Sequence, residues 1–377
     1  MRIVYCINNT WYAGGMTRVL SNKVNYFASK GYDVTIITTD QIGKESNYLI
    51  HPAVKHIDLN INYLYDDKKS FVKRLLALPI SYIDHYNRLN KRLSAIEADV
   101  VIGMFTKDVY LLPFLKDKSA KILEIHSTRY TWLRNRLNRG LIGKFQNWLD
   151  SFIVKKYDRF VVLTNEDLKN WSELSNVQVI ANANTFITDK VSYLENKVAI
   201  AVGRYDQGKN FSQMIDVWAK VCVKHPDWKL KIIGDGSLRD VLEAKVEDCG
   251  FSNNIELSFP TNKIMEAYLD SSLLLMTSLY EGLPMVLLEG QSCGLPLISY
   301  SCPCGPRDII THGENGYLVE VGDVEGMAKY IIQLIENPEL RSKMSRNAKL
   351  NSMKFSEEKI MEQWINLFED LSLKGRK

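Results

Sequence analysis

Short apolar runs alternate with amphipathic stretches along almost the whole chain, and this alternation limits the possible folds most. Runs such as RIVYCI at 2–7 and SSLLLMTS at 271–278 are largely apolar, as expected of parallel strands that helices cover on both faces. The pattern pauses across a polar stretch at 181–196 and then restarts. Because 377 residues are long for one core, the sequence predicts two doubly wound α/β domains.

Charge is divided unevenly between the two halves of the chain. Residues 1–190 hold 27 Lys and Arg against 18 Asp and Glu, whereas the whole chain holds 48 against 44. The first half is therefore basic and the remainder acidic, which favours an anionic ligand or surface at the first half. Ordinary solvated faces would account for the same distribution.

Two stretches of the basic half, 71–93 and 129–156, mix Lys and Arg with large apolar residues. Basic amphipathic helices of this kind are typical of proteins that lie on an anionic membrane surface. The alternative is that both are ordinary helices packed on a core. Nucleic-acid binding is not predicted, because the basic residues are dispersed and no recognition motif is present.

Composition disfavours several other classes of protein. No segment has the ~18 consecutive apolar residues of a membrane-spanning helix, and the apolar run at 3–7 is too short for a signal-peptide core. We therefore expect a cytoplasmic protein. The six cysteines are too scattered for a disulfide framework. The CPC sequence at 302–304 lacks a second Cys or His pair at zinc spacing, so no metal site is predicted.

Ligands of open α/β sheets bind beyond the carboxyl ends of the strands, and glycines follow two of the expected strands. Gly14 and Gly15 lie between the first strand and a helix, and Gly236 lies in GDGS at 234–237. Such glycines let a ligand approach the backbone, and the helix N-terminus favours an anion. An ordinary glycine turn is the alternative. Neither site has the G-x-G-x-x-G spacing of dinucleotide-binding domains.

Two cations follow the strand expected at 196–203, in the sequence GRYDQGKNF. Arg204 presents a planar fork that suits phosphate oxygens, and Lys209 a mobile point charge. Beside the N-terminus of the next helix, this pair predicts a diphosphate site. A pair of merely solvated cations is the alternative.

Two carboxylates lie eight residues apart in YEGLPMVLLEGQSCGLP at 280–296. Pro284 suits the first turn of a helix, so we expect a helix from about 284 to Cys293, with Glu281 just before it and Glu289 inside it. Both carboxylates can then face one elongated ligand, with the helix N-terminus between them, which suits a sugar nucleotide. Alternatively, Glu289 is a surface residue and Glu281 only stabilises the helix dipole.

In this order, the glycines at 14–15 and the segments GRYDQGKN, IIGDGSLRD, YEGLPMVLLEGQSCGLPLI and GPRDIITHGENGYLV resemble the family-4 retaining glycosyltransferases of bacterial polysaccharide and surface-glycan synthesis. The resemblance implies the GT-B fold, with two Rossmann-like doubly wound parallel-sheet domains facing a central cleft. It implies an acceptor-side domain at 1–182 and a donor-binding domain at 190–355. The C-terminal helix, within 356–377, would cross back onto the first domain.

The resemblance also implies roles for the residues at the two sites. Arg204 and Lys209 would neutralise the donor diphosphate, and Glu289, as the second residue of the family's Glu-x7-Glu motif, would bind the ribose. Glu281 and His126 would lie near the transferred sugar. The donor phosphates would approach the backbone of the two glycine loops and of the segment before the helix at 284. We expect these donor-binding residues to be Gly14, Gly15, Gly236, Gly282, Leu283 and Pro284. A histidine that only packs at the end of its strand is the alternative for His126.

By the same resemblance, the reaction would be transfer with retention from a nucleotide diphosphate sugar, UDP being favoured over GDP. It would need no metal and no cofactor. The acceptor would be a hydroxyl of a growing, lipid-linked glycan, and the protein would lie peripherally at the inner face of the cell membrane. Two alternatives are a GT-B sugar-nucleotide epimerase or hydrolase and an NAD-dependent Rossmann enzyme. The missing glycine fingerprint counts against the second.

Overall fold

The computed structural model describes residues 1–63, 71–137, 139–185 and 188–374. The chain divides into two compact units. Unit 1 comprises Met1–Leu163, Asn170–Ile180 and the C-terminal part from Met361 onward, and unit 2 comprises Thr164–Lys169 and Ala181–Ile360. The last helix begins at Glu357, and the change of unit falls within it.

The described part of unit 1 contains a seven-stranded sheet in the order β3-β2-β1-β4-β5-β6-β7. Neighbouring strands are parallel throughout. The strand order reverses between β1 and β4, and the central strand β1 is buried along Ile3, Val4 and Tyr5. The strands are β1 (Arg2–Ile7), β2 (Asp33–Thr38), β3 (Lys55–Asp58), β4 (Val100–Gly103), β5 (Ala120–Glu124), β6 (Arg159–Val162) and β7 (Val177–Val179).

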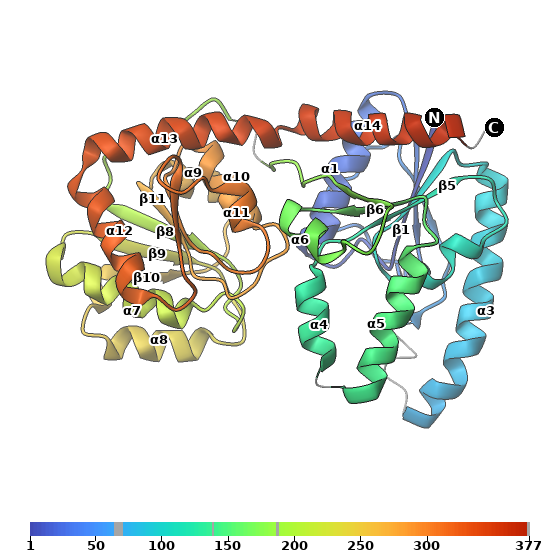
Figure 1. The fold of residues 1–377 in the computed structure, drawn as a ribbon, viewed down its shortest axis with the longest axis horizontal. Coiled ribbons are helices and arrows are strands. Elements are labelled where there is room, and N and C mark those ends of the chain that lie inside the picture. The colour runs from blue at the N-terminus through green and yellow to red at the C-terminus, as the bar shows by residue number, and fades with distance from the viewer. Residues whose placement is uncertain (64–70, 138, 186–187, 375–377) are drawn as a thin grey trace. The chain divides into compact units, whose positions relative to one another are not determined.

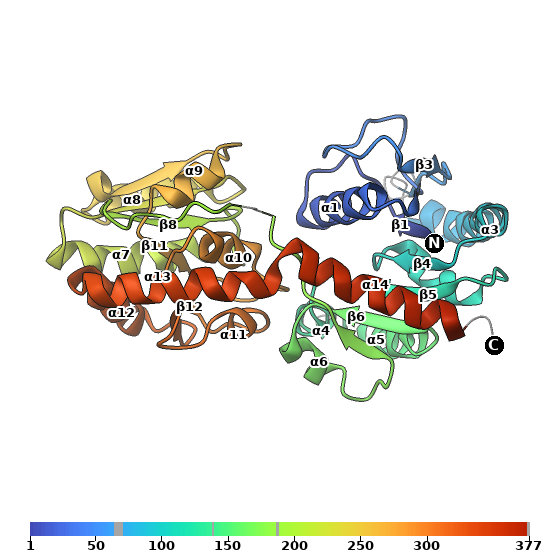
Figure 2. The same cartoon turned by 90° about the horizontal axis from the view of Figure 1, so that it is seen from above.

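Helices cover this sheet, and the chain's last helix is one of them. In Figures 1 and 2, α14 lies alongside α1, and Phe368 of α14 packs against Phe27 of α1 with ring centroids 5.5 Å apart. Buried aromatic contacts of this kind stabilise the docking of a terminal helix. The α-helices described between residues 1 and 180 are α1 (Gly15–Ser29), α3 (Phe71–Ile96), α4 (Arg129–Leu137), α5 (Gly140–Val154) and α6 (Asn165–Asn170), and the last helix is α14 (Glu357–Lys374). Of these, α6 belongs to unit 2 except for its last residue.

The described part of unit 2 contains a six-stranded parallel sheet in the order β10-β9-β8-β11-β12-β13, which reverses between β8 and β11. Its strands are β8 (Val198–Val202), β9 (Lys229–Ile233), β10 (Ile255–Ser258), β11 (Leu273–Met276), β12 (Leu297–Tyr300) and β13 (Gly316–Val319). Its helices are α7 (Phe211–Lys224), α8 (Arg239–Asp248), α9 (Ile264–Leu269), α10 (Met285–Ser292), α11 (Pro306–Ile309), α12 (Val324–Glu336) and α13 (Pro338–Ser352).

Both sheets confirm the doubly wound α/β architecture expected from the sequence. The strands expected at 2–7, 196–203 and 271–278 are observed as β1, β8 and β11, whereas two strands of unit 1, β3 and β7, were not expected. Both are edge strands, β3 with the sequence KHID and β7 with only three residues. Edge strands need not be continuously apolar, because one side of the ladder faces away from the sheet. Within the described ranges, no helix has the length and hydrophobicity needed to cross a bilayer.

Candidate donor-binding site

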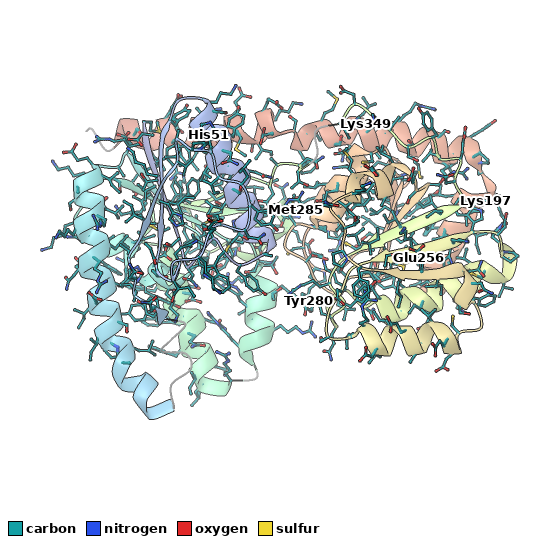
Figure 3. All side chains as sticks on the ribbon, turned by 180° about the vertical axis from the view of Figure 1, so that it is seen from behind. His51, Lys197, Glu256, Tyr280, Met285 and Lys349 are labelled. Carbon is teal, nitrogen blue, oxygen red and sulfur yellow. The ribbon has the colours of Figure 1, made fainter. Side chains whose placement is uncertain are left out.

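The reversal of strand order in unit 2 brings two of the predicted loops together. β8 and β11 are neighbours, with Ala199 opposite Leu273, so the loops that follow them leave the same edge of the sheet. Such a reversal is where doubly wound sheets bind their ligands. The loop after β8 carries both predicted cations, and the loop after β11 carries Glu281. In Figure 3, Tyr280 is labelled within this second loop and Met285 at the start of the helix that follows it.

Lys209 and Glu281 form an ion pair that joins these two loops. Lys209 Nζ lies 2.5 Å from Glu281 Oε1, and their side chains are 23% and 12% exposed. The loops are also joined through the backbone, where the N–H of Leu279 donates to the carbonyl of Gly208 over 2.8 Å. The sequence assigned these side chains to different parts of a ligand, the diphosphate and the sugar. In the structure each is the other's partner, so a ligand that takes up either charge competes with this pair.

Arg204 is held much less firmly. Its side chain is 82% exposed, and Nη2 lies 3.4 Å from Asp206 Oδ2. An exposed pair at this separation contributes little to stability. The guanidinium is therefore able to reorient toward an anion at low cost, which is compatible with the predicted diphosphate contact.

Helix α10 begins immediately after the Glu281 loop. Pro284 is its N-cap residue, with φ −73° and ψ 97°, so the helix starts one residue later than expected. No side-chain oxygen caps this end of the described helix, and the first N–H groups of a helix lack intrahelical partners. Gly282 and Leu283 form the approach to this helix end. The arrangement suits an anion held by backbone N–H groups.

Glu289 lies inside α10 and is buried, with 6% of its surface exposed. The alternative of a surface glutamate is therefore wrong. Tyr268 of α9 donates its hydroxyl to Oε2 over 2.9 Å, and Thr185 donates to Oε1 over 2.8 Å. These bonds offset the cost of burying the carboxylate. A carboxylate oxygen can accept more than one hydrogen bond.

Tyr268 and Thr185 were not predicted to belong to this site. No local pattern marks Thr185, which follows the polar ANAN sequence. Tyr268 carries no local signal either, because its burial is a property of the fold; once it is known to be fully buried, its hydroxyl needs a partner. The identity of that partner becomes evident only when α9 and α10 are placed side by side.

Gly236 has a packing reason to be glycine. Its φ is +157°, and a Cβ at this position would lie 2.6 Å from the carbonyl oxygen of Tyr205. Backbone hydrogen bonds join the same loop to Tyr205, whose N–H donates to the carbonyl of Asp235 and whose carbonyl accepts from the N–H of Leu238. A side chain at 236 would force these segments apart. The predicted contact of Gly236 with phosphate remains a prediction.

Gly14 and Gly15 of unit 1 differ in this respect. Gly14 is the N-cap of α1 in an extended conformation, with φ −166°, and Gly15 is the first helical residue. A Cβ on Gly14 would make only ordinary contacts, and one on Gly15 would meet no described atom within 4 Å. Because neither backbone conformation nor packing requires glycine here, the approach of a ligand remains a good reason for both.

His126 lies two residues beyond the end of β5, not within the strand as expected. Its Nε2 lies 3.3 Å from Oε1 of Glu124, a residue without exposed surface. Burial lowers the pKa of His126 to about 4, although Glu124 opposes this shift. The imidazole is therefore neutral at physiological pH and suited to hydrogen bonding rather than to charge neutralisation.

A buried ion pair lies behind His126 and was not foreseen from the sequence. Lys23 of α1 donates to Glu124 Oε1, and the side chains are 2% and 0% exposed. The Lys23 ammonium also lies 4.0 Å from the ring centroid of Trp364 on α14. The group thus links the helix that follows the glycine pair, the strand that precedes His126 and the C-terminal helix. A lysine among the apolar positions of α1 was the available signal.

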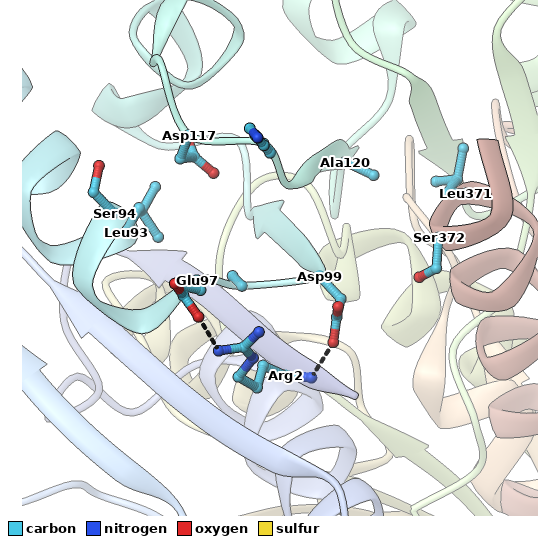
Figure 4. Close-up of a pocket in the computed structure, with 11 residues that line it drawn as sticks. Arg2, Leu93, Ser94, Glu97, Asp99, Asp117, Ala120, Leu371 and Ser372 are labelled. Atoms are coloured by element: carbon cyan, nitrogen blue, oxygen red, sulfur yellow. Dashed lines mark hydrogen bonds and ion pairs between the residues drawn. The ribbon is translucent and has the colours of Figure 1, made fainter. Parts of the chain in front are cut away.

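A cavity of about 480 Å³ in unit 1 lies at the end of the sheet opposite to His126 and the glycine pair. Figure 4 shows Arg2 there, whose backbone N–H donates to Asp99 Oδ2 over 2.7 Å and whose Nη1 donates to Glu97 over 3.0 Å. These residues lie at the amino ends of β1 and β4. Ligands of such sheets bind at the carboxyl ends, and none of the predicted site residues lines this cavity.

Comparison with known proteins agrees with the geometry of unit 2. The family model described as "Glycosyl transferases group 1" matches residues 183–351. An uncharacterized glycosyltransferase of Haemophilus influenzae is 30% identical over 372 residues, which cover 96% of this chain and 98% of the relative. The chain belongs to the group 1 glycosyltransferases. This glycosyltransferase is also 35% identical to the amylovoran biosynthesis glycosyltransferase AmsD of Erwinia amylovora, over 56% of its own length and 62% of the relative's.

Solved structures of glycosyltransferases share the fold of this group 1 glycosyltransferase. Staphylococcus aureus TarM, in a complex that contains UDP, superposes with a TM-score of 0.77 at 18% identity, over 97% of this chain and 99% of that one. Anabaena HepE in complex with UDP gives 0.77 at 15% identity, over 98% and 100%. At such identities the similarity concerns the fold, which is GT-B, as the resemblance implied.

Proposed function

We propose that this glycosyltransferase transfers a sugar, with retention of configuration, from a UDP-sugar to a hydroxyl of a growing glycan. The observation that carries the proposal is the Lys209–Glu281 pair at the strand reversal of unit 2, beside the N-terminus of α10. A cation, a carboxylate and a helix N-terminus in one place match the diphosphate and sugar of such a donor.

In the proposed reaction, the diphosphate draws Lys209 away from Glu281. The developing negative charge on the leaving group is then stabilised by Lys209, by the mobile Arg204 and by the N-terminus of α10. Glu281, released from its partner, accepts hydrogen bonds from hydroxyls of the transferred sugar. These groups neutralise the leaving group without a metal, so we propose a metal-independent reaction.

Glu289 binds the ribose in this proposal, with Tyr268 and Thr185 fixing the carboxylate. A carboxylate whose two oxygens already accept hydrogen bonds cannot rotate freely, so its orientation is fixed before the nucleoside binds. This preorganisation lowers the entropic cost of binding the nucleoside.

UDP is proposed as the nucleotide because TarM and HepE are described as complexes with UDP. A glycan acceptor is proposed because AmsD is named for amylovoran biosynthesis and a further relative, from Staphylococcus aureus, is named poly(ribitol-phosphate) alpha-N-acetylglucosaminyltransferase. We further propose that the acceptor is lipid-linked and that the protein acts in the cytoplasm, peripherally at the inner face of the cell membrane.

The test is a thermal-shift panel of UDP-, GDP- and ADP-sugars. A ligand that binds the native state raises the apparent stability by mass action, so the UDP-sugar donor should raise the melting temperature most. Lys209→Met should abolish the shift, and Lys197→Met, which removes an exposed ion pair with Asp227 elsewhere in unit 2, should keep it. Equal shifts in both variants would contradict the assignment of the site.

Product analysis separates transfer from the alternative reactions of a GT-B enzyme. Nuclear magnetic resonance of the product should show a glycoside of retained anomeric configuration that forms only when acceptor is present. Release of free sugar or of an epimer at the same rate without acceptor would favour a hydrolase or an epimerase. An inverted product would refute retention.

A further inference from the structure

Large apolar side chains form a row on the outer side of α5 in unit 1. The row comprises Leu141, Ile142, Phe145, Trp148 and Phe152, which are between 43% and 83% exposed. Their spacing of one, three, three and four residues puts them on one side of a helix. We call these five residues the apolar stripe. Figure 1 shows α5 extending away from the sheet of unit 1 beside α4.

The aromatic members of the apolar stripe are stacked on one another. The rings of Phe145 and Trp148 lie 5.7 Å apart at 29°, and those of Trp148 and Phe152 lie 5.9 Å apart at 14°. The exposed apolar area is therefore continuous from Phe145 to Phe152. Continuous exposed apolar patches mark interaction surfaces, whereas scattered exposed apolar residues do not.

The opposite side of α5 is anchored, so the stripe cannot turn inward. Asp150 is buried and accepts hydrogen bonds from Arg136 of α4 and from the hydroxyl of Tyr110, the latter over 2.7 Å. Gly143 lets α4 approach closely, because a Cβ there would lie 2.1 Å from the carbonyl oxygen of Arg136. Packing therefore holds the stripe in its exposed position.

Basic residues border the apolar stripe. Lys144, Lys155 and Lys156 are exposed, and Lys156 Nζ lies 5.2 Å from the ring centroid of Phe152. The sequence from 129 to 156 holds seven Lys and Arg and a single acid, the buried Asp150. No carboxylate of α5 therefore opposes the approach of an anionic surface.

We infer that the apolar stripe and its three bordering lysines form the surface by which this protein docks on an anionic lipid bilayer. Aromatic and aliphatic side chains would enter the interface between headgroups and acyl chains, and the lysines would contact anionic headgroups. A symmetric contact between two copies is disfavoured, because it would bring the lysines of both copies together.

This inference rests on the proposed function for its purpose, since a lipid-linked acceptor brings the enzyme to a membrane. It narrows the contact to one of the two basic stretches identified in the sequence. On α3, Ile80 and Ile83 are also exposed, but the adjacent Asp84 forms an ion pair with Arg88, so no excess positive charge from these two residues lies beside them.

Co-sedimentation of the full chain with vesicles, without any sugar donor, tests the inference. The chain should bind vesicles of equal parts phosphatidylcholine and phosphatidylglycerol, and much less to phosphatidylcholine alone. Phe145→Ser combined with Trp148→Ser should weaken binding about tenfold or more. Lys144→Glu combined with Lys156→Glu should weaken it by a similar factor.

A matched control replaces exposed apolar residues of unit 2. Val223→Ser combined with Val241→Ser, both more than half exposed on α7 and α8, should leave vesicle binding unchanged. Lipids with brominated acyl chains should quench the tryptophan fluorescence of the wild type. Trp148→Phe should still bind these vesicles but should show less quenching.

Equal vesicle binding by the wild type and the stripe variant would overturn the inference. So would a lipid-free dimer, found by sedimentation velocity, that the stripe variant abolishes, because a second copy would then cover the stripe. The thermal shift with donor is measured on the wild type and on the same variants. A wild type that shows the donor shift but binds no vesicles would overturn the inference and leave the donor site standing. A wild type that binds vesicles but shows no donor shift would refute only the proposed donor site.

Discussion

The buried Lys23–Glu124 pair makes a quantitative test of the packing in unit 1. Its side chains are 2% and 0% exposed, so removal of one partner leaves the other charge without compensation in the interior. Breaking such a pair typically costs about 3–5 kcal/mol. We therefore expect Lys23→Met, which keeps the length of the side chain, to lower the free energy of unfolding of unit 1 by about 4 kcal/mol.

The double variant, Lys23→Met with Glu124→Gln, should be much less destabilised than either single variant. It buries no uncompensated charge, and what remains lost is chiefly the attraction between Lys23 and the Trp364 ring, 4.0 Å away. That attraction is worth about 0.5–2 kcal/mol. The effects of the two substitutions should thus be strongly non-additive.

Hydrogen–deuterium exchange of peptides from α1, β1 and β5 measures the stability of unit 1 without interference from unit 2. The control is Lys55→Met, because the Lys55–Asp33 pair of the same unit is 63% and 42% exposed, and exposed pairs contribute at most about 1 kcal/mol. If Lys23→Met lowered the free energy of unfolding of unit 1 no more than Lys55→Met does, the cost assigned to the uncompensated buried charge would be wrong. A double variant whose loss equals the sum of the two single losses would refute the reasoning.

The remaining predictions concern the donor site, the metal, the histidine and one glycine. Glu289→Ala should weaken donor affinity at least tenfold, and Tyr268→Phe should weaken it less, by calorimetry; unchanged affinity in both would undo the ribose assignment. Activity should survive EDTA, and abolition with rescue by Mg²⁺ would contradict a metal-independent reaction. The pKa of His126 falls to about 4 on folding, so the unfolded state binds more protons between pH 4 and 6.5. Stability should therefore rise with pH across this window, by up to about 3 kcal/mol. His126→Gln should flatten that rise in urea titrations, and an unaltered slope would contradict the lowered pKa. Gly236→Ala should lower the melting temperature through contact with the Tyr205 backbone, whereas Gly15→Ala should not.

Strand positions were predictable wherever burial dictated them. The central strands of both sheets are covered on two faces and therefore consist of apolar runs, such as LLLM in β11. The edge strands β3 and β7 escaped prediction because neither is a continuous apolar run, β3 having the sequence KHID and β7 only three residues, and backbone pairing with a neighbour defines them. Thr35 of β2, for instance, lies opposite Lys55 of β3.

The two-domain α/β architecture could be predicted from residue order alone, and so could the order of the loops that carry Arg204, Lys209 and Glu281 and of the helix that carries Glu289, because periodicity, glycines and Pro284 are local signals. The partners of these side chains became known only from the folded chain. The pairing of Lys209 with Glu281 and the bond from Tyr268 to Glu289 join residues 72 and 21 positions apart. Such contacts depend on which strands become neighbours and on how helices pack, and no local pattern of residue types specifies either.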